Sequence, residues 1–172
     1  MKFVVEDDII TSLGGKPWPT TTIMVGVHGN ELSWPIALQK LLAEWLTIDC
    51  GKVHYIYANP QALTLEQRYV DTDLNRSFGR SNLWYEAKRA KILMSYLQES
   101  DYLLDIHNTI DLSTPPFIIS EHDTLLHYFD VLRCVRWLDD LHPGSTDAYS
   151  NSQNNKSVCL EVWSTVDDIE TT

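Results

Sequence analysis

The sequence predicts an α/β protein, a three-layer α/β/α domain with a mixed, mostly parallel central sheet. Five short runs of β-branched and other apolar residues are expected to be strands: residues 21–27, 53–58, 102–106, 117–119 and 158–163. Two longer segments between them, residues 31–46 and 83–97, carry apolar residues at helical spacing. Because strands that alternate with such helices form sheets covered on both faces, this order of elements predicts the three layers.

The two helices are predicted from their apolar faces. In residues 31–46, Trp34, Leu38 and Leu41 recur at helical spacing, and Pro35 falls in the first turn, where its missing N–H costs no hydrogen bond. The apolar face of the second helix consists of Leu83, Ala87, Ala90, Leu93, Met94 and Leu97. Elsewhere, the polar tract 150–157 predicts a loop, and residues 125–137 resemble a helix.

Length and composition predict one folded domain over residues 1–172. Hydrophobic residues make up 44% of the 172 residues, which is enough for a single core. Thirteen Lys and Arg against 24 Asp and Glu give a net charge of -11. Such a charge repels phosphate backbones and anionic lipid surfaces, so we expect neither nucleic acid nor a membrane as a partner.

The cysteines and the N-terminal segment predict a cytoplasmic protein. Cys50, Cys134 and Cys159 are odd in number and form no C-x-x-C pair, so no disulfide framework is indicated. The N-terminal residues turn acidic after five positions, too early for the apolar region of a signal peptide. No run approaches the length of about 18 apolar residues that a membrane span needs.

Two histidines and a glutamate have the chemistry of an open zinc site. His28 and Glu31 lie at H-x-x-E spacing after the first predicted strand, and His107 follows another strand. Two imidazoles and a carboxylate make a three-ligand site with a fourth position for water. Alternatively, the short motif occurs by chance and His107 is a histidine of the core. The position of both pieces at strand ends favours the zinc site.

Glu161 lies inside an apolar strand and is a candidate general acid/base. Hydrolysis at an open zinc site needs a group that accepts a proton from water and returns it to the leaving amine. A carboxylate within an apolar strand is costly unless it has a partner or a chemical role. The alternative is a glutamate on an edge strand that faces solvent.

Residues 59–78 bring together groups that fit a substrate carboxylate. Arg68, Asn75 and Arg76 lie in a segment too irregular for one helix or strand. Two guanidinium groups and an amide can bind a carboxylate, and a free guanidinium can stabilise a developing oxyanion. The alternative is a set of surface ion pairs with Asp71 and Asp73.

Five sequence blocks, taken in order, resemble the succinylglutamate desuccinylase/aspartoacylase family of zinc-carboxypeptidase-like amidohydrolases. The blocks read H-G-N-E at 28–31, N-P at 59–60, R-Y-V-D-T-D-L-N-R-S-F at 68–78, D-I-H-N-T at 105–109 and L-E-V at 160–162. The resemblance spans roughly residues 21 to 163 and is weakest between 114 and 155.

The resemblance implies a zinc-carboxypeptidase-like fold, one zinc ion and hydrolysis of the amide bond of a small N-acyl amino acid. It implies that His28, Glu31 and His107 are the zinc ligands and that Glu161 is the general acid/base. The smaller C-terminal β domain usual in the family is expected to be absent or truncated, which leaves residues 1–172 as a single catalytic domain.

The resemblance also implies a substrate that carries a carboxylate. Arg68 would polarise the scissile carbonyl, and Asn75 and Arg76 would bind the carboxylate. The second carboxylate-binding arginine of aspartoacylase-like members has no counterpart that we can identify. Arg133 and Arg136 lie on the helix-like stretch and are expected at the surface.

Three alternatives stay open at this stage. The first is a carboxypeptidase that acts on short peptides, because Asn75 and Arg76 would bind a terminal carboxylate equally well. The second is a zinc-binding or ligand-binding module without turnover, and the third is a structural domain with packed histidines. The sequence also leaves open whether the protein forms a homo-oligomer.

Overall fold

The structure, a computed structural model, describes residues 8–44, 47–109, 113–129, 133–136 and 142–163. Within these ranges the strands are β1 (Ile9–Leu13), β2 (Thr20–Val25), β3 (Lys52–Tyr57), β4 (Tyr102–Asn108), β5 (Phe117–Ile119), β6 (Cys134–Val135) and β7 (Lys156–Val162). The helices are α1 (Ser33–Ala43), α2 (Pro60–Leu65), α3 (Tyr85–Glu99), α4 (Asp123–Leu126) and α5 (Thr146–Ser152), with one 3-10 turn, η1 (Leu74–Arg76).

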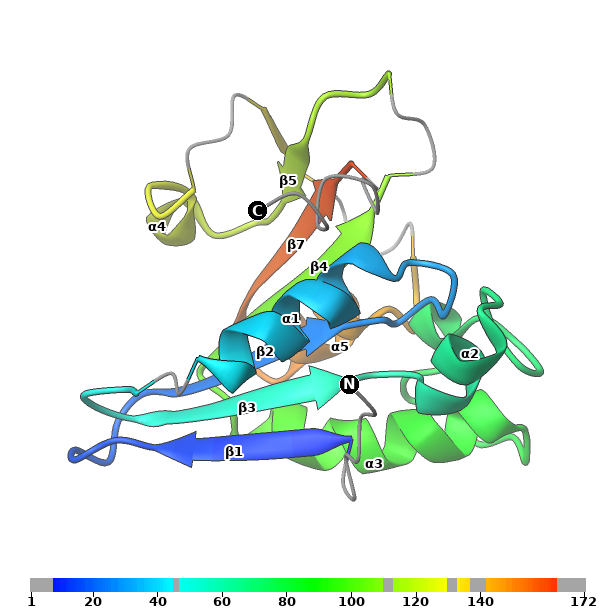
Figure 1. The fold of residues 1–172 in the computed structure, drawn as a ribbon, viewed down its shortest axis with the longest axis horizontal. Coiled ribbons are helices and arrows are strands. Elements are labelled where there is room, and N and C mark those ends of the chain that lie inside the picture. The colour runs from blue at the N-terminus through cyan, green and yellow to red at the C-terminus, as the bar shows by residue number, and fades with distance from the viewer. Residues whose placement is uncertain (1–7, 45–46, 110–112, 130–132, 137–141, 164–172) are drawn as a thin grey trace.

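The strands form one mixed sheet in the order β1-β3-β2-β4-β7-β5-β6. Its centre is parallel, because β2 pairs with β3 and β4, and β4 pairs with β7, all in the same direction. β1 is antiparallel to β3, and β5 is antiparallel to β7. The carboxyl ends of the four parallel strands therefore share one edge of the sheet (Figure 1).

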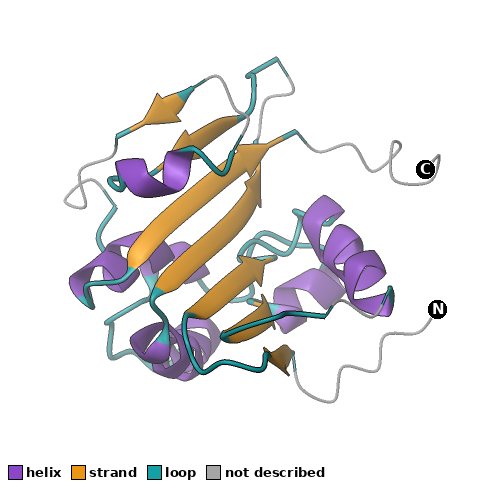
Figure 2. Ribbon diagram, turned by 90° about the vertical axis from the view of Figure 1, so that its left-hand side faces the viewer, coloured by secondary structure: helices purple, strands orange, loops and turns teal. Residues whose placement is uncertain are grey.

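Helices cover both faces of the sheet, and each face has its own core. On one face, α1 packs through Leu38 on Val25, Tyr55 and Ile106. On the other face, α3 packs on the strand residues that alternate with these along the chain. This second cluster contains Met24, Ile56, Ala90, Leu93, Leu97 and Leu103. Figure 2 shows the sheet between these helical layers. The predicted three-layer fold is confirmed.

The main elements coincide with the predicted ones to within a few residues, and two segments differ. The tract 150–157 is not a loop throughout, because its first residues finish α5 and β7 begins at Lys156. The helix-like stretch 125–137 is wrong as a helix: α4 ends at Leu126, and Cys134 lies in β6. Arg133 and Arg136 are nevertheless exposed, as expected.

Two features bear on the expected environment of the protein. Each helix in the described ranges is too short or too polar to cross a lipid bilayer. The three cysteines are free, with Cys50 and Cys134 exposed and Cys159 buried. Cys159 lies on β7, directly opposite Asp105 of β4, and so belongs to the interior of the sheet.

Substitution of a core residue of α3 tests this packing. Leu93 has no exposed surface, so Leu93→Ala leaves a cavity and is expected to lower the free energy of unfolding by about 2–5 kcal/mol. Ile92, its neighbour on the same helix, is 50% exposed, and Ile92→Ala should cost less than about 1 kcal/mol. Urea titration measures both values. Equal losses in the two variants would contradict the assigned helix face.

Candidate active site

The predicted site residues converge at the edge where the parallel strands end. His28 and Glu31 follow β2, His107 is the penultimate residue of β4, and Glu161 is the penultimate residue of β7. His107 and Glu161 are paired in the β4–β7 register. β7 lies between β4 and β5, so the alternative of Glu161 on an edge strand is wrong.

The turn that carries His28 and Glu31 depends on a glycine. The Gly29 N–H donates to the Arg68 carbonyl at 3.2 Å, which ties this turn to the segment after α2. A Cβ at Gly29 would lie 2.1 Å from the carbonyl carbon of Ala62, so any larger residue would push the turn away from α2. The close approach fixes both functional side chains relative to Arg68.

His28, Glu31 and His107 form a buried cluster that could hold a metal ion. His28 Nδ1 lies 2.6 Å from one Glu31 carboxylate oxygen, and His107 Nδ1 lies 3.1 Å from the other. One nitrogen or oxygen from each of the three residues lies within 4.8 Å of the others. The Asn108 N–H also donates to Glu31 at 3.1 Å. The structure thus brings together the three residues that the sequence predicted as zinc ligands.

Two aspartates lie behind the histidines: Asp73, which the sequence suggested only as an ion-pair partner of the arginines, and Asp105, which had no predicted role. Asp73 Oδ1 lies 3.2 Å from His28 Nε2, and Asp105 Oδ2 lies 3.1 Å from His107 Nε2. In metal sites, a carboxylate on the far ring nitrogen orients the imidazole and sets its tautomer. Each aspartate therefore leaves Nδ1 of its histidine as the nitrogen that faces Glu31 and any bound metal.

The charges within the cluster reinforce one another. Burial raises the pKa of Glu31, but the hydrogen bonds with His107 and His28 outweigh burial and lower this pKa to about 2. Burial lowers the pKa of His28, yet the hydrogen bonds with Asp73 and Glu31 raise it above its ordinary value. Glu31 is therefore a carboxylate at neutral pH, as a metal ligand must be.

Asn75, Arg76 and Arg68 line the same pocket as the histidines. The Thr146 N–H donates to Asn75 Oδ1 at 2.9 Å, so the Asn75 NH₂ group stays available to a ligand. Arg68 donates to Asp73 at 3.1 Å, so one of the ion pairs considered as an alternative role for the arginines does form. Because Asp73 also contacts His28, this ion pair holds the guanidinium beside the cluster rather than at a distant surface.

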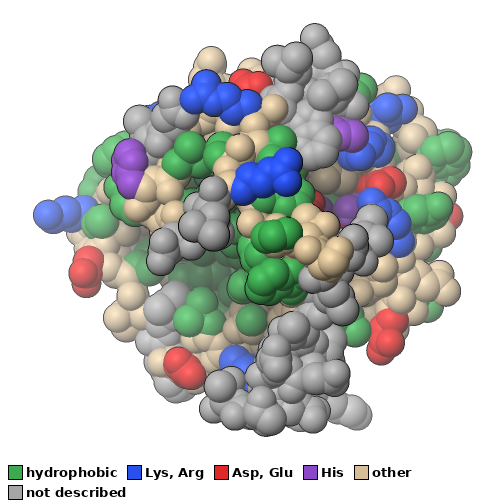
Figure 3. Space-filling view, turned by 90° about the horizontal axis from the view of Figure 1, so that it is seen from above, with side chains coloured by type: hydrophobic (Ala, Val, Ile, Leu, Met, Phe, Trp, Pro, Cys, Tyr) green, Lys and Arg blue, Asp and Glu red, His purple; other side chains and the backbone are tan. Residues whose placement is uncertain are grey.

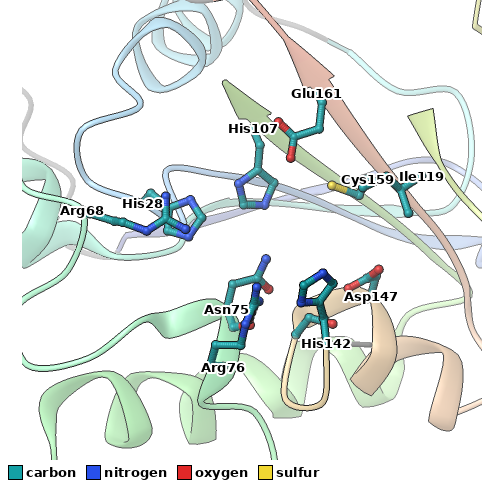
Figure 4. A pocket seen from close by; sticks show the side chains of 11 residues that line it. His28, Arg68, Asn75, Arg76, His107, Ile119, His142, Asp147, Cys159 and Glu161 are labelled. Carbon is teal, nitrogen blue, oxygen red and sulfur yellow. Dashed lines mark hydrogen bonds between the residues drawn. The ribbon is translucent and has the colours of Figure 1, made fainter. Parts of the chain in front are cut away.

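Glu161 lies on the wall of the pocket above the histidines (Figure 4). Burial raises the pKa of Glu161; the His107 charge opposes this shift, while Glu31 and Asp105 add to it. A carboxyl group with a raised pKa exchanges protons more readily near neutral pH than an exposed one. This property suits a group that accepts a proton and later donates it.

The pocket has a volume of about 120 Å³. Besides the predicted residues, it is lined by Ile119, His142, Ser145, Asp147 and Cys159. Figure 3 looks onto the end of the molecule at which β4 and β7 finish, and there Lys, Arg, Asp, Glu and His side chains gather on the right-hand side. The volume suits a small polar molecule better than a long chain.

Glu86 is a second group that the sequence analysis missed. It belongs to the first turn of α3 and has no exposed surface. Its carboxylate accepts the backbone N–H groups of Val70, Asp71 and Thr72 at 2.6, 3.1 and 3.1 Å. These residues lie between Arg68 and Asp73 in the chain, so Glu86 fixes the loop that carries both groups. No short motif marks such a contact.

Fold and site together define a class of protein, an α/β domain of the zinc-carboxypeptidase type with a His/Glu/His cluster at the carboxyl ends of its parallel strands. A family model of the succinylglutamate desuccinylase/aspartoacylase catalytic domain matches residues 17–163. The chain belongs to this family, as its sequence blocks predicted. Its curated relatives carry the names aspartoacylase and N-acyl-aromatic-L-amino acid amidohydrolase.

Individual relatives agree with this assignment. An N-acyl-aromatic-L-amino acid amidohydrolase (carboxylate-forming) from Xenopus tropicalis is 35% identical over 168 residues, which cover 81% of this chain and 53% of the relative. An aspartoacylase from the same organism is 32% identical over 136 residues, with coverages of 69% and 44%. The crystal structure of an aspartoacylase family protein from Mesorhizobium loti has a TM-score of 0.72 at 26% identity, covering 90% of this chain and 55% of that one. The chain spans about half the length of the curated relatives it matches.

Removal of the Glu86 charge tests its role in the loop. Glu86→Gln replaces one acceptor oxygen with an NH₂ group that faces backbone donors, and should lower the free energy of unfolding by about 2–3 kcal/mol. Exposed Glu44 on the other helical layer serves as the control, and Glu44→Gln should cost less than about 0.5 kcal/mol. Chemical denaturation measures both. Wild-type stability of Glu86→Gln would contradict the proposed anchoring.

Proposed function

We propose that this protein is a zinc-dependent amidohydrolase that cleaves the amide bond of a small N-acyl amino acid. The observation that carries the proposal is the buried cluster of His28, Glu31 and His107, with a carboxylate behind each imidazole. Membership in a family of N-acyl amino acid deacylases supports the reaction type. The pocket that contains the cluster also offers groups for a proton transfer and for a carboxylate.

The three side chains fit zinc by their chemistry. Two imidazole nitrogens and one carboxylate oxygen are the ligand set of open zinc sites, and the paired carboxylates on the outer nitrogens match the usual surroundings of such ligands. A zinc ion at this position supplies Lewis-acid polarisation of the scissile carbonyl and of the attacking water. In our proposal His28, Glu31 and His107 are its protein ligands.

Glu161 moves the proton in the proposed reaction. Its carboxylate accepts a proton from water while the water oxygen attacks the amide carbonyl carbon. Glu161 then gives this proton to the amide nitrogen as the C–N bond breaks. One water is consumed, and the products are the carboxylate of the acyl group and the free amino acid. The raised pKa of Glu161 supports both steps.

The remaining polar groups bind and polarise the substrate. The Arg68 guanidinium, held beside the cluster by Asp73, is directed to stabilise negative charge on the carbonyl oxygen during attack. Asn75 presents its NH₂ group to the substrate carboxylate because Thr146 occupies its oxygen. Arg76 adds a positive charge at the same place. The substrate of this proposal is therefore a small molecule that bears a carboxylate.

Two substitutions separate metal binding from catalysis. His107→Ala should lower the zinc content of the purified protein, because one of three protein ligands is lost. Glu161→Gln should retain zinc and lose about 10²–10⁴-fold in kcat, the usual contribution of a general acid/base. Elemental analysis and hydrolysis of N-acetyl amino acids measure the two effects. The exposed residues His127 and Glu121 provide matched controls in His127→Ala and Glu121→Gln.

The outcome also separates this function from its alternatives. Full activity in Glu161→Gln would remove the proposed proton carrier. Zinc binding without hydrolysis would favour a binding module, and faster hydrolysis of dipeptides than of N-acetyl amino acids would favour a carboxypeptidase. A zinc content near zero, with no change in stability when zinc is added, would favour a structural domain.

A further inference from the structure

Asp147 is an acidic group on the pocket wall that the proposed reaction does not use. It lies in the first turn of α5, is half-buried, and lines the pocket together with Ile119 and Cys159. In the part of the chain that the structure describes, no hydrogen bond or ion pair engages its carboxylate. Its charge acts on His142 and on Cys159, which share the pocket. Asp147 is thus available to a bound molecule.

The position of Asp147 is fixed relative to the carboxylate-binding residues. Thr146, its neighbour, is completely buried and donates its N–H to Asn75 Oδ1, and its hydroxyl lies between Asn75 Oδ1 and Asp105 Oδ2. Before it, the Gly144 carbonyl accepts the Phe78 N–H at 3.0 Å. The start of α5 is therefore tied to the same segment that carries Asn75.

The glycine at position 144 permits this close contact. Its φ is +89°, a conformation that other residues rarely adopt, and a Cβ there would lie 2.7 Å from the Arg76 carbonyl oxygen. The backbone three residues before Asp147 is therefore packed directly against the backbone of Arg76 and Phe78.

The charges of the pocket are unevenly distributed. In Figure 4, Arg68 lies at one end, Asn75 and Arg76 lie near the middle, and Asp147 lies at the opposite end. Arg68 and Arg76 are the permanent cations among the described residues that line the pocket, and neither lies at the Asp147 end. A substrate group that reaches Asp147 would meet a carboxylate that forms no ion pair among the described residues, with the Arg76 charge acting on His142 beside it. A second substrate carboxylate would be repelled there, whereas a cationic group would form a charge-assisted hydrogen bond.

We propose that Asp147 selects an N-acyl amino acid whose side chain ends in a cationic group, in preference to a second carboxylate. The proposal rests on the proposed function and specifies its substrate class. One end of the substrate binds to Asn75 and Arg76 through its carboxylate, and the side chain reaches Asp147. A competing role for Asp147 is purely structural, as a negative charge that stabilises the first turn of α5.

Three substrates of similar length test the selection on the zinc-loaded protein. Nα-acetyl-ornithine carries a cationic side chain, Nα-acetyl-glutamine a neutral one and Nα-acetyl-glutamate an anionic one. We expect kcat/KM for the ornithine derivative to exceed that for the glutamate derivative by about tenfold or more, as one charge-assisted hydrogen bond provides. A ratio of one or below would overturn the proposal.

Substitution of Asp147 separates selection from a structural role. Asp147→Asn should lower the ratio of kcat/KM for ornithine over glutamine derivatives by about tenfold, and Asp147→Lys should reverse the preference towards the glutamate derivative. The exposed Asp49 is the matched control, and Asp49→Asn should leave the ratio unchanged. If Asp147→Asn lowers only the stability and not the ratio, the structural role is correct and the selection is wrong.

A binding measurement distinguishes failure of this inference from failure of the proposed function. If none of the three substrates is hydrolysed by the zinc-loaded protein, the proposed amidohydrolase function fails. Calorimetric titration of Glu161→Gln with the ornithine and glutamate derivatives still tests the inference without turnover. Tighter binding of the ornithine derivative by about tenfold supports selection by Asp147, and equal or reversed affinities contradict it.

Discussion

The site depends on one interaction, the Glu31 carboxylate held between Nδ1 of His28 and Nδ1 of His107. It joins the turn after β2 to the end of β4, two segments 76 residues apart in the chain. Burial of three titratable side chains is costly unless they are paired, and each of these is paired. Asp73 and Asp105 behind the imidazoles bring the cluster to three carboxyl groups for two imidazoles, a balance that a divalent cation would complete.

A second set of contacts holds this centre from outside. Glu86 anchors the loop that carries Asp73, and Thr146 connects Asn75 to Asp105. Glu86 and Thr146 have no exposed surface. Glu86 accepts hydrogen bonds from backbone N–H groups of the loop, and the Thr146 hydroxyl contacts the side chains of Asn75 and Asp105. The two supports come from α3 and α5, which are far apart in the chain, and Ala90 of α3 and Tyr149 of α5 pack in the same core cluster. These contacts hold in place the residues that we propose bind charge, and such preorganisation is what electrostatic selection requires.

The sequence predicted what depends on local pattern and on strand direction. The parallel sheet placed His28, Glu31, His107 and Glu161 at one edge. That much followed from the positions of the first three at strand ends and from the position of Glu161 within the last apolar strand. Asp73 was considered only as an ion-pair partner of the arginines, a contact that Arg68 does make. Its contact with His28 and the roles of Asp105 and Glu86 were not predicted, because they come from residues distant in the chain or from backbone donors, which leave no periodic pattern. The prediction of a loop at 150–157 was wrong for a related reason. Polar residues of this tract, such as Asn155 and Ser157, are buried and form hydrogen bonds inside the fold. Asn155, for example, donates to the Leu97 carbonyl.

The most direct test of the central claim is a crystal structure of the zinc-soaked protein with diffraction data collected on both sides of the zinc absorption edge. We expect one anomalous peak about 2.0–2.2 Å from His28 Nδ1, His107 Nδ1 and a Glu31 oxygen, with an open position towards Glu161. A peak that involves other side chains, or no peak between these three residues at full zinc saturation, would contradict the account.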